Sequence, residues 1–410
     1  MNDIYTIILV LSTFVLFYSL VSKFIKDILY LPESLISMVF GILIGPYVLN
    51  VLKTSNLISK IFMYNISRVI LCIQTMSVAL SLPRYYILEK WQSLFVLVVC
   101  IGIIKCLVTT GIVYLIGRYD IALSWSLAAC LTPTDPILSS SIVKGKFASR
   151  TVPRRIRILL SAESGVNDGL GIILLFIGVD INTYGIKEGV KIFLIDNLAI
   201  KVFVSAIFGL CIGTVTKACF KYCYSRKLIG MESFMSHTFL LVLLSLGLME
   251  YIGGSELICI FFCGSVFSSD EWLNVENRNS SSQDLMDNLL STSFFVFFGS
   301  RIDFGQFTLL TIISSLLILI FRRPLICFLM YRHVPELRTK KEGLFVGWFG
   351  PIGVGAIYYA LLVDKTVGSL TINYASVVVF FSVLIHGLTV PLYALYSQYF
   401  ITEQNRNSLI

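Results

Sequence analysis

Long apolar runs alternate with short polar gaps along almost the whole chain. A run of about 18 or more apolar residues is long enough to cross a bilayer as a helix. About thirteen runs of spanning or near-spanning length follow one another, at approximately 4–22, 34–51, 61–82, 92–117, 120–143, 156–179, 194–218, 234–252, 255–268, 286–300, 307–331, 342–363 and 373–399. The ninth and tenth runs are short, so their ends are the least sharply marked. The pattern predicts an all-α polytopic membrane protein with about 13 transmembrane helices.

Composition agrees with this pattern. Of the 410 residues, 56% are hydrophobic and 14% are charged, whereas about a quarter of the residues in a soluble domain are charged. The chain ends about ten residues after its last apolar run, so we expect one transmembrane domain over 1–410 and no soluble C-terminal domain. The first run has no basic residues before it and no small-residue cleavage pattern, which favours a spanning helix over a removed signal.

Basic residues are distributed unequally between alternate loops. Loops after odd-numbered runs hold about 19 Lys and Arg, against about 7 in loops after even-numbered runs, which places the odd loops in the cytoplasm. The largest cluster comprises Lys144, Lys146, Arg150, Arg154, Arg155 and Arg157. We therefore expect an outside N-terminus and a cytoplasmic C-terminus. The formal net charge of +8 reflects membrane topology and does not indicate a nucleic-acid partner.

The sixth run carries four polar side chains at membrane depth. On a helix, Glu163, Asn167, Ser164 and Asp168 fall in that angular order across an arc of about 140°. Ionisable groups inside a spanning helix usually mark an ion or proton path and have a partner. Because Glu163 and Asp168 lie at opposite edges of this stripe, we expect them to meet different partners. A purely structural ion pair is the alternative.

Two runs are interrupted at corresponding places. The fifth contains LTPTDP, where Pro133 and Pro136 remove backbone donors and clash with the preceding turn, so the helix cannot continue from Thr132 to Pro136. The twelfth contains GWFGPIGVGA, with its break at Gly350, Pro351 and Gly353. Unwound backbone at membrane depth is tolerated where it is buried in protein or lines a wet cavity. The alternative is that these prolines only kink packed helices.

The positions of the two breaks predict an internal repeat. If the first six and the last six runs are repeat units, about 1–180 and 234–400, each break falls in the fifth helix of its unit. The linker helix at about 190–218 then inverts the second unit relative to the first. We therefore expect two inverted six-helix repeats whose discontinuous fifth and twelfth helices cross.

Oxygen ligands are concentrated at the first break and on the polar stripe. Asp135 lies within the break, next to Thr134, whose hydroxyl and backbone oxygens suit a hard cation. Asp168, Ser164 and Thr134 would form a small all-oxygen site for Na⁺ or Li⁺ with one exchangeable negative charge. A single carboxylate holds either one cation or one proton, and this competition is the chemistry of an antiporter.

Glu163 needs a countercharge, and the eleventh run offers two candidates. Arg322 and Arg323 interrupt about two dozen apolar residues, and a guanidinium at that depth must find a partner or reach water. We predict that Arg323 pairs with Glu163, with Arg322 as the second choice. The alternative is that both arginines extend to the cytoplasmic surface.

Three stretches, LTPTDPILSSSIVKGKF, LLSAESGVNDG and FVGWFGPIGVGA, together resemble the fungal-type plasma-membrane sodium/proton antiporters of the monovalent cation/proton antiporter superfamily. The resemblance extends from GILIGPYVLN through RVILCIQ and SLPRYY to IHGLTVPLY. It implies a homodimer of thirteen-helix protomers in which interleaved dimerisation and core subdomains move in an elevator-like cycle.

The same resemblance implies roles for individual residues. Asp168 would be the carboxylate that binds the ion and carries the proton. Asn167 would pair with the broken helix near Thr134 and Asp135, and Glu163 would pair with the arginine that matches Arg323. An Asn-Asp pair is associated mainly with electroneutral exchange.

The chain departs from the family pattern in two places. Relatives usually carry a glutamate where this sequence has Ser81, and in some members that acid approaches the ion site. Many fungal relatives also have a long cytoplasmic tail, which is not expected here because the sequence ends at Ile410.

Together these features predict an antiporter that exports Na⁺ or Li⁺ at the cell surface in exchange for protons, with the lipid bilayer, alkali cations and protons as its partners and no cofactor. The alternatives are an antiporter that also accepts K⁺, a cation channel on the same fold, and a sensor that does not transport. An enzyme is not expected, because Ser164 lies in ESG rather than in a nucleophile elbow and no histidine is close to it in sequence.

Overall fold

The computed structural model describes residues 3–52, 58–136, 138–139, 148, 151–230, 233–269 and 282–407. Within these ranges every regular element is a helix. The α-helices are α1 Asp3–Phe24, α2 Glu33–Ile44, α3 Lys60–Ser81, α4 Tyr86–Glu89, α5 Trp91–Leu94, α6 Ile101–Ile112, α7 Ile121–Cys130, α10 Arg154–Tyr184, α11 Ile186–Ile192, α12 Ser205–Ser225, α13 Ser233–Ile252, α14 Glu256–Ser268, α16 Ser282–Arg301, α17 Leu309–Ile320, α18 Ile326–Met330, α19 Lys340–Trp348, α20 Val354–Val367 and α21 Thr371–Asn407. π-Helical stretches of five or more residues continue some of them, as η1 Ile25–Leu29, η3 Phe95–Cys100, η4 Val113–Gly117, η5 Phe193–Val204 and η7 Phe321–Leu325.

Seven helical stretches in the described part of the chain are long and apolar enough to cross a bilayer. They are Ile4–Phe24, Lys60–Ser81, Trp91–Gly117, Arg154–Tyr184, Ile186–Ser225, Leu309–His333 and Thr371–Leu395. Four shorter apolar helices of 10–17 residues lie between them in sequence. The chain is therefore a multi-span, all-helical membrane protein. Of the basic cluster between the fifth and sixth apolar runs, Lys144, Lys146 and Arg150 lie outside the described residues.

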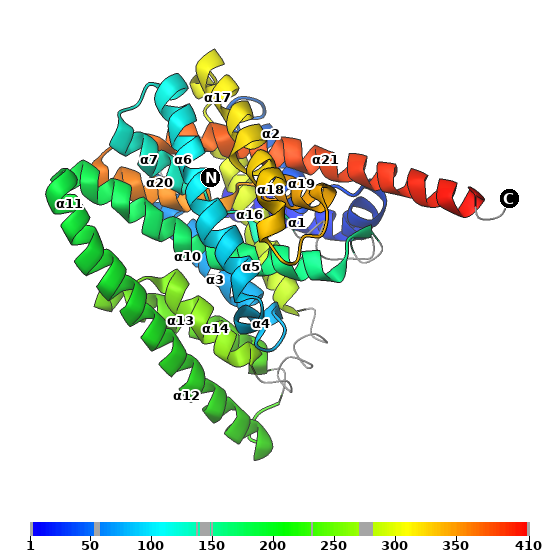
Figure 1. Ribbon diagram of the computed structural model, residues 1–410. Helices are drawn as coiled ribbons and strands as arrows, with labels where there is room; N and C mark the ends of the chain where they lie inside the picture. Colours follow the sequence, from blue (N-terminus) through cyan, green and yellow to red (C-terminus); the bar gives the residue numbers. More distant parts are fainter. Residues whose placement is uncertain are drawn as a thin grey trace.

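Glycines allow several helices to pack at backbone distance. A Cβ at Gly41 of α2 would overlap the carbonyl oxygen of Val296 on α16, and a Cβ at Gly299 of α16 would overlap that of Met38. Small residues permit such close approach between helices in a membrane, where packing replaces the hydrophobic effect as the source of association. Helices α12, α13 and α14 lie together at one end of the molecule, and α10 crosses the middle of the molecule (Figure 1).

Two helical segments are interrupted within apolar runs, and their interruptions meet. Helix α7 ends at Cys130, and residues 131–135 are not helical. Helix α19 ends at Trp348, and helical structure resumes with α20 at Val354. The backbone N–H of Asp135 donates to the carbonyl oxygen of Pro351 at 2.9 Å, which joins the two unwound segments. We call this place, residues 131–135 and 349–353, the crossing.

Candidate functional site

Helix α10 presents its polar stripe to the interior of the protein. Its start is set by Pro153 at the N-cap and its end by Gly185, whose φ of 78° no other residue type adopts easily. Glu163 and Asn167 are 1% exposed, and Ser164 and Asp168 are 2% exposed. Such burial in a spanning helix requires a partner or a function for each group.

Asn167 and Ser164 attach the first break to α10. The Asn167 amide donates from Nδ2 to Thr134 Oγ1 at 2.7 Å and accepts the backbone N–H of Thr134 at 3.4 Å. The hydroxyls of Thr134 and Ser164 are 3.2 Å apart. Thr132 lies outside this group, because its hydroxyl donates to the Ala128 carbonyl one turn back in α7. Thr134, Ser164 and Asn167 therefore form one hydrogen-bonded unit beside Asp168.

The Asp168 carboxylate has no cation or hydrogen-bond donor at its buried Oδ2 atom among the described residues. It lines a narrow pocket with Leu71, Gln74, Pro133, Thr134, Asp135, Pro136, Gly353, Gly355 and Ala356. Tyr359 of α20 donates to the backbone oxygen of Asp168 at 2.9 Å, so this contact fixes the main chain and leaves the carboxylate free.

Asp135 has the opposite environment within the same pocket. Its Oδ2 accepts the N–H of Val354 at 2.9 Å, and its Oδ1 accepts the N–H of Leu138 at 3.1 Å. Val354 begins α20, and Leu138 is a helical residue directly after the first break. A helix N-terminus carries unpaired N–H groups and a partial positive charge, which a carboxylate stabilises. A Cβ at Gly353 would overlap the Asp135 carboxylate, so glycine is required there. These contacts favour a bracing role for Asp135.

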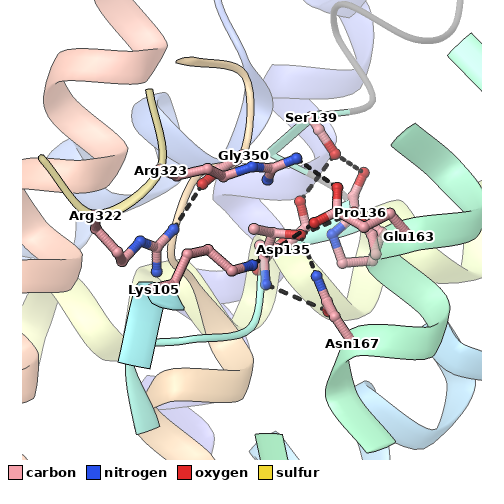
Figure 2. Close-up of polar contacts among 11 residues, drawn as sticks. Lys105, Asp135, Pro136, Ser139, Glu163, Asn167, Arg322, Arg323 and Gly350 are labelled. Carbon is pink, nitrogen blue, oxygen red and sulfur yellow. Dashed lines mark hydrogen bonds and ion pairs between the residues drawn. The ribbon is translucent and has the colours of Figure 1, made fainter. Parts of the chain in front are cut away.

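Arg322 binds the C-terminal ends of the two interrupted helices, as Asp135 binds the N–H groups after the breaks. Its guanidinium donates to the carbonyl oxygen of Leu131 and, at 2.9 Å, to that of Gly350. These carbonyls follow α7 and α19, where the half-helices carry partial negative charge. Figure 2 shows Arg322 reaching toward Gly350. From the sequence Arg322 was only the second choice as a partner for Glu163, and the structure gives it different contacts.

Glu163 lies between two cations. Arg323 contacts its Oε2 through Nη2, and the Nζ atom of Lys105 on α6 is 3.7 Å from its Oε1. A Cβ at Gly350 would overlap the Arg323 guanidinium, so this glycine makes room for the pair. In Figure 2 the cationic side chains lie on one side of the crossing, and Glu163 and Asn167 reach in from α10 on the other.

Formal charges at the crossing balance when Asp168 is ionised. The cations are Lys105, Arg322 and Arg323, and the anions are Asp135, Glu163 and Asp168. Of the three anions, Asp135 is bound by helix N-termini and Glu163 by cations. Asp168 remains as the buried anion whose Oδ2 has no partner among the described residues.

Sequence reasoning missed several of these contributors. Lys105 is an isolated basic residue in an apolar run, and nothing in its spacing identified Glu163 as its neighbour. Gln74 and Tyr359 carry no charge and gave no signal. Ser81, the position at which relatives carry an acid, is exposed at the end of α3 and donates to the Val78 carbonyl at 2.8 Å. It does not line the Asp168 pocket.

Comparison with known proteins places this geometry in a family. The model of the family "Sodium/hydrogen exchanger, transmembrane" matches residues 10–395. The chain is 34% identical to Na(+)/H(+) antiporter 2 of Zygosaccharomyces rouxii, over 84% of this chain and 44% of that protein. It is 33% identical to the Na(+)/H(+) antiporter of Saccharomyces cerevisiae, over 84% of this chain and 36% of that protein. The chain thus spans less than half the length of these two relatives.

A solved structure extends the comparison to the fold. The sodium proton antiporter MjNhaP1 of Methanocaldococcus jannaschii superposes with a TM-score of 0.74 at 18% identity, covering 96% of this chain and 97% of that one. At this identity the similarity establishes the shared fold. Together with the match of the family model over 386 of the 410 residues, these findings show that the chain belongs to the sodium/hydrogen exchanger family of membrane transporters.

Proposed function

We propose that this protein exchanges Na⁺ or Li⁺ for protons across a membrane by alternating access, with Asp168 as the group that binds either ion. The observation that carries the proposal is the buried Oδ2 of Asp168, which has no partner among the described residues and lies beside two broken helices. Relatives at 33–34% identity are named as Na⁺/H⁺ antiporters, which supports the choice of substrates.

The chemistry follows from the ligands around Asp168. Ser164 and Thr134 offer neutral oxygens next to one carboxylate, which suits a hard monovalent cation. When the cation leaves, a proton neutralises the same carboxylate. Since the other two acids at the crossing hold fixed partners, one charge is exchanged per cycle, and we infer electroneutral one-for-one exchange.

The hydrogen bonds at the crossing support movement of the site as one body. Asn167 ties α10 to the first break, Asp135 ties the first break to α20, and Glu163 ties α10 to Arg323. In the elevator-like cycle that we propose, these elements move together past helices such as α3 and α14. Contacts that join the two groups, including the Tyr358 hydroxyl with Glu256 at 2.8 Å, would break during the movement.

The proposed architecture is that of thirteen spanning segments in two inverted repeats, with the N-terminus outside and the C-terminus cytoplasmic, in the plasma membrane. We further propose a homodimer. Only 6% of the Ile4–Phe24 span and 17% of the Ile186–Ser225 span are buried within the protomer, so these two spans offer the most surface to lipid or to a second copy.

The test is proton movement in sealed liposomes that contain the purified protein. Under an imposed pH gradient, addition of Na⁺ or Li⁺ should release protons, as a pH-sensitive dye reports, and choline should not. The signal should be lost in Asp168→Asn while the protein remains folded and monodisperse. An active Asp168→Asn protein would contradict the proposal, and K⁺ in the same assay measures the breadth of selectivity.

Two controls distinguish electroneutral exchange from exchange that generates a current and from a channel. A one-for-one exchanger generates no current, so the rate should not change when the membrane potential is clamped with K⁺ and valinomycin, used with Na⁺ or Li⁺ as substrate. A channel would instead carry downhill cation flux without a counter-ion and would show unitary currents in planar bilayers.

A further inference from the structure

Helix α3 contributes a polar side chain to the Asp168 pocket that the proposed site does not use. Gln74 is 1% exposed and lines the pocket together with Asp168. Its helix is neither α10 nor one of the two broken helices, so it approaches the pocket from a separate element. An uncharged amide buried at this depth needs a partner for each of its polar atoms.

The two ends of the Gln74 amide differ in their partners. Nε2 donates to the hydroxyl of Ser291 on α16 at 3.2 Å. Oε1 is buried and has no hydrogen-bond partner among the described residues. The amide is thus anchored by its nitrogen, and its oxygen is the polar atom without a hydrogen-bond partner on a residue that lines the pocket.

Two oxygens with unfilled acceptor capacity therefore belong to residues that line one pocket, Asp168 Oδ2 and Gln74 Oε1. An ionised carboxylate oxygen and an amide oxygen both accept, so they cannot satisfy each other. A cation between them satisfies both. We propose that the Gln74 carbonyl oxygen is a direct, neutral ligand of the alkali cation held by Asp168. This inference rests on the proposed function and adds a specificity-determining residue to it.

The neutrality of the ligand has a consequence for coupling. A proton on Asp168 requires one oxygen, whereas a dehydrated alkali cation requires several. Gln74 therefore strengthens cation binding relative to proton binding without adding a second titrating charge. Because Ser81, at the C-terminal end of the same helix, supplies no acid, α3 adds no second exchangeable charge.

The competing explanation is that Gln74 only tethers α3 to α16 through Ser291. The two explanations make different predictions for three variants. Gln74→Met keeps the length and burial of the side chain but removes the amide oxygen. Ser291→Ala removes the tether and keeps the oxygen, so it is the matched control. Gln74→Glu keeps the shape and places a charged oxygen at the same position.

The experiment measures the Na⁺ and Li⁺ dependence of proton release in liposomes, with the cation added from either side of the membrane. We expect Gln74→Met to raise the half-saturating concentration at least about tenfold on one side or both, the scale of one lost polar contact to a charged group. The maximal rate at saturating cation should stay within about twofold. Ser291→Ala should shift half-saturation by less than about threefold, and Gln74→Glu should lower it.

A second readout does not depend on transport. Binding of a ligand to the native state raises the melting temperature in proportion to the logarithm of its concentration. NaCl, compared with choline chloride, should stabilise the purified parent protein, and Gln74→Met should need about tenfold more NaCl for the same increase. Equal cation dependence of the parent and Gln74→Met in both assays would overturn the inference.

Failure of the inference is distinguishable from failure of the proposed function. If the parent protein shows no cation-dependent proton release, the antiporter proposal fails. If the parent exchanges cations normally and Gln74→Met has the same half-saturation, only the role of Gln74 fails. Should Gln74→Met not fold, Gln74→Leu decides the question, because it also removes the amide oxygen, and an unchanged half-saturation in that variant excludes a direct ligand.

Discussion

Asp135 and Asp168 line the same pocket, and their side chains are 4% and 2% exposed. The Asp135 carboxylate is saturated, meaning that each of its two oxygens accepts a backbone N–H. Arg322 donates to the carbonyl oxygens of Leu131 and Gly350 at the same crossing. The α10 side of the pocket is unsaturated, because Oδ2 of Asp168 has no partner among the described residues. A saturated carboxylate stabilises structure, whereas an unsaturated one is free to bind an ion. Burial alone does not separate these two roles, but the inventory of donors does.

The largest expected effect comes from Asp168→Asn, which removes the exchangeable charge. Exchange should fall to the level of protein-free liposomes. The melting temperature in the absence of alkali cations should not decrease, because the substitution removes a buried charge that lacks a partner. Dye-based flux and differential scanning fluorimetry on one preparation check both statements. A marked loss of stability would show that Asp168 is a structural group like Asp135.

Glu163→Gln should produce the largest loss of stability. It leaves Arg323 and Lys105 buried without their anion, and breaking a buried pair in this way costs about 3–5 kcal/mol. The loss should appear as a lower melting temperature in detergent. Introducing Arg323→Met into the Glu163→Gln variant should restore part of it, since one uncompensated cation is then removed. No rescue in the double variant would argue against the direct pair.

Asp135→Asn should have an intermediate effect. The amide retains one oxygen as an acceptor, so the N–H of either Leu138 or Val354 loses its acceptor, and the N-terminus of α20 loses the compensating charge. We expect destabilisation of about 1–3 kcal/mol. Residual exchange in the folded fraction should keep the cation affinity of the parent. A changed half-saturation with unchanged stability would instead assign Asp135 to the ion site.

The smallest effect concerns Asp303, an exposed acid in the loop between α16 and α17. Hydrogen bonds from the Gln306 side chain, the Gly305 N–H and Tyr47 lower the pKa of Asp303 below its ordinary value. A lowered pKa means that the stabilisation is present above the ordinary value of 3.8 and is lost as pH falls through the lowered pKa. Asp303→Asn should therefore reduce the melting temperature slightly at pH 7.

The measurement that checks this prediction is the melting temperature of Asp303→Asn and of the parent as a function of pH. Below pH 3.8 the difference between Asp303→Asn and the parent should shrink. A constant difference across the pH range would mean that the hydrogen bonds, and not the charge, account for the effect. Exchange should be unchanged, because Asp303 does not line the Asp168 pocket.

Local sequence patterns predicted the individual helices and their interruptions. Apolar run length identified the multi-span character, because a membrane requires every backbone polar group to be satisfied within a helix. Pro133 and Pro351 indicated interruptions, because proline has no N–H to donate to the carbonyl oxygen one turn earlier. The glycines near Pro351 also have a low helix propensity. The 3.6-residue period placed Glu163, Ser164, Asn167 and Asp168 on one stripe. These are short-range effects, and they are encoded in short stretches of chain.

The sequence by itself thus determined that the chain spans a membrane repeatedly, that two helices are interrupted, and that three acids and several cations lie at membrane depth. The sequence offered the Glu163–Arg323 pair as a prediction with alternatives, and the tertiary structure decided which of the groups meet. Lys105 and Arg323 reach Glu163 from residues 58 and 160 positions away, and Gln74 and Asp168 reach one pocket from different helices. Helical periodicity gives the direction of a side chain on its own helix, but not the helix that faces it. That choice depends on the packing of the whole bundle, and it separates the saturated Asp135 from the unsaturated Asp168.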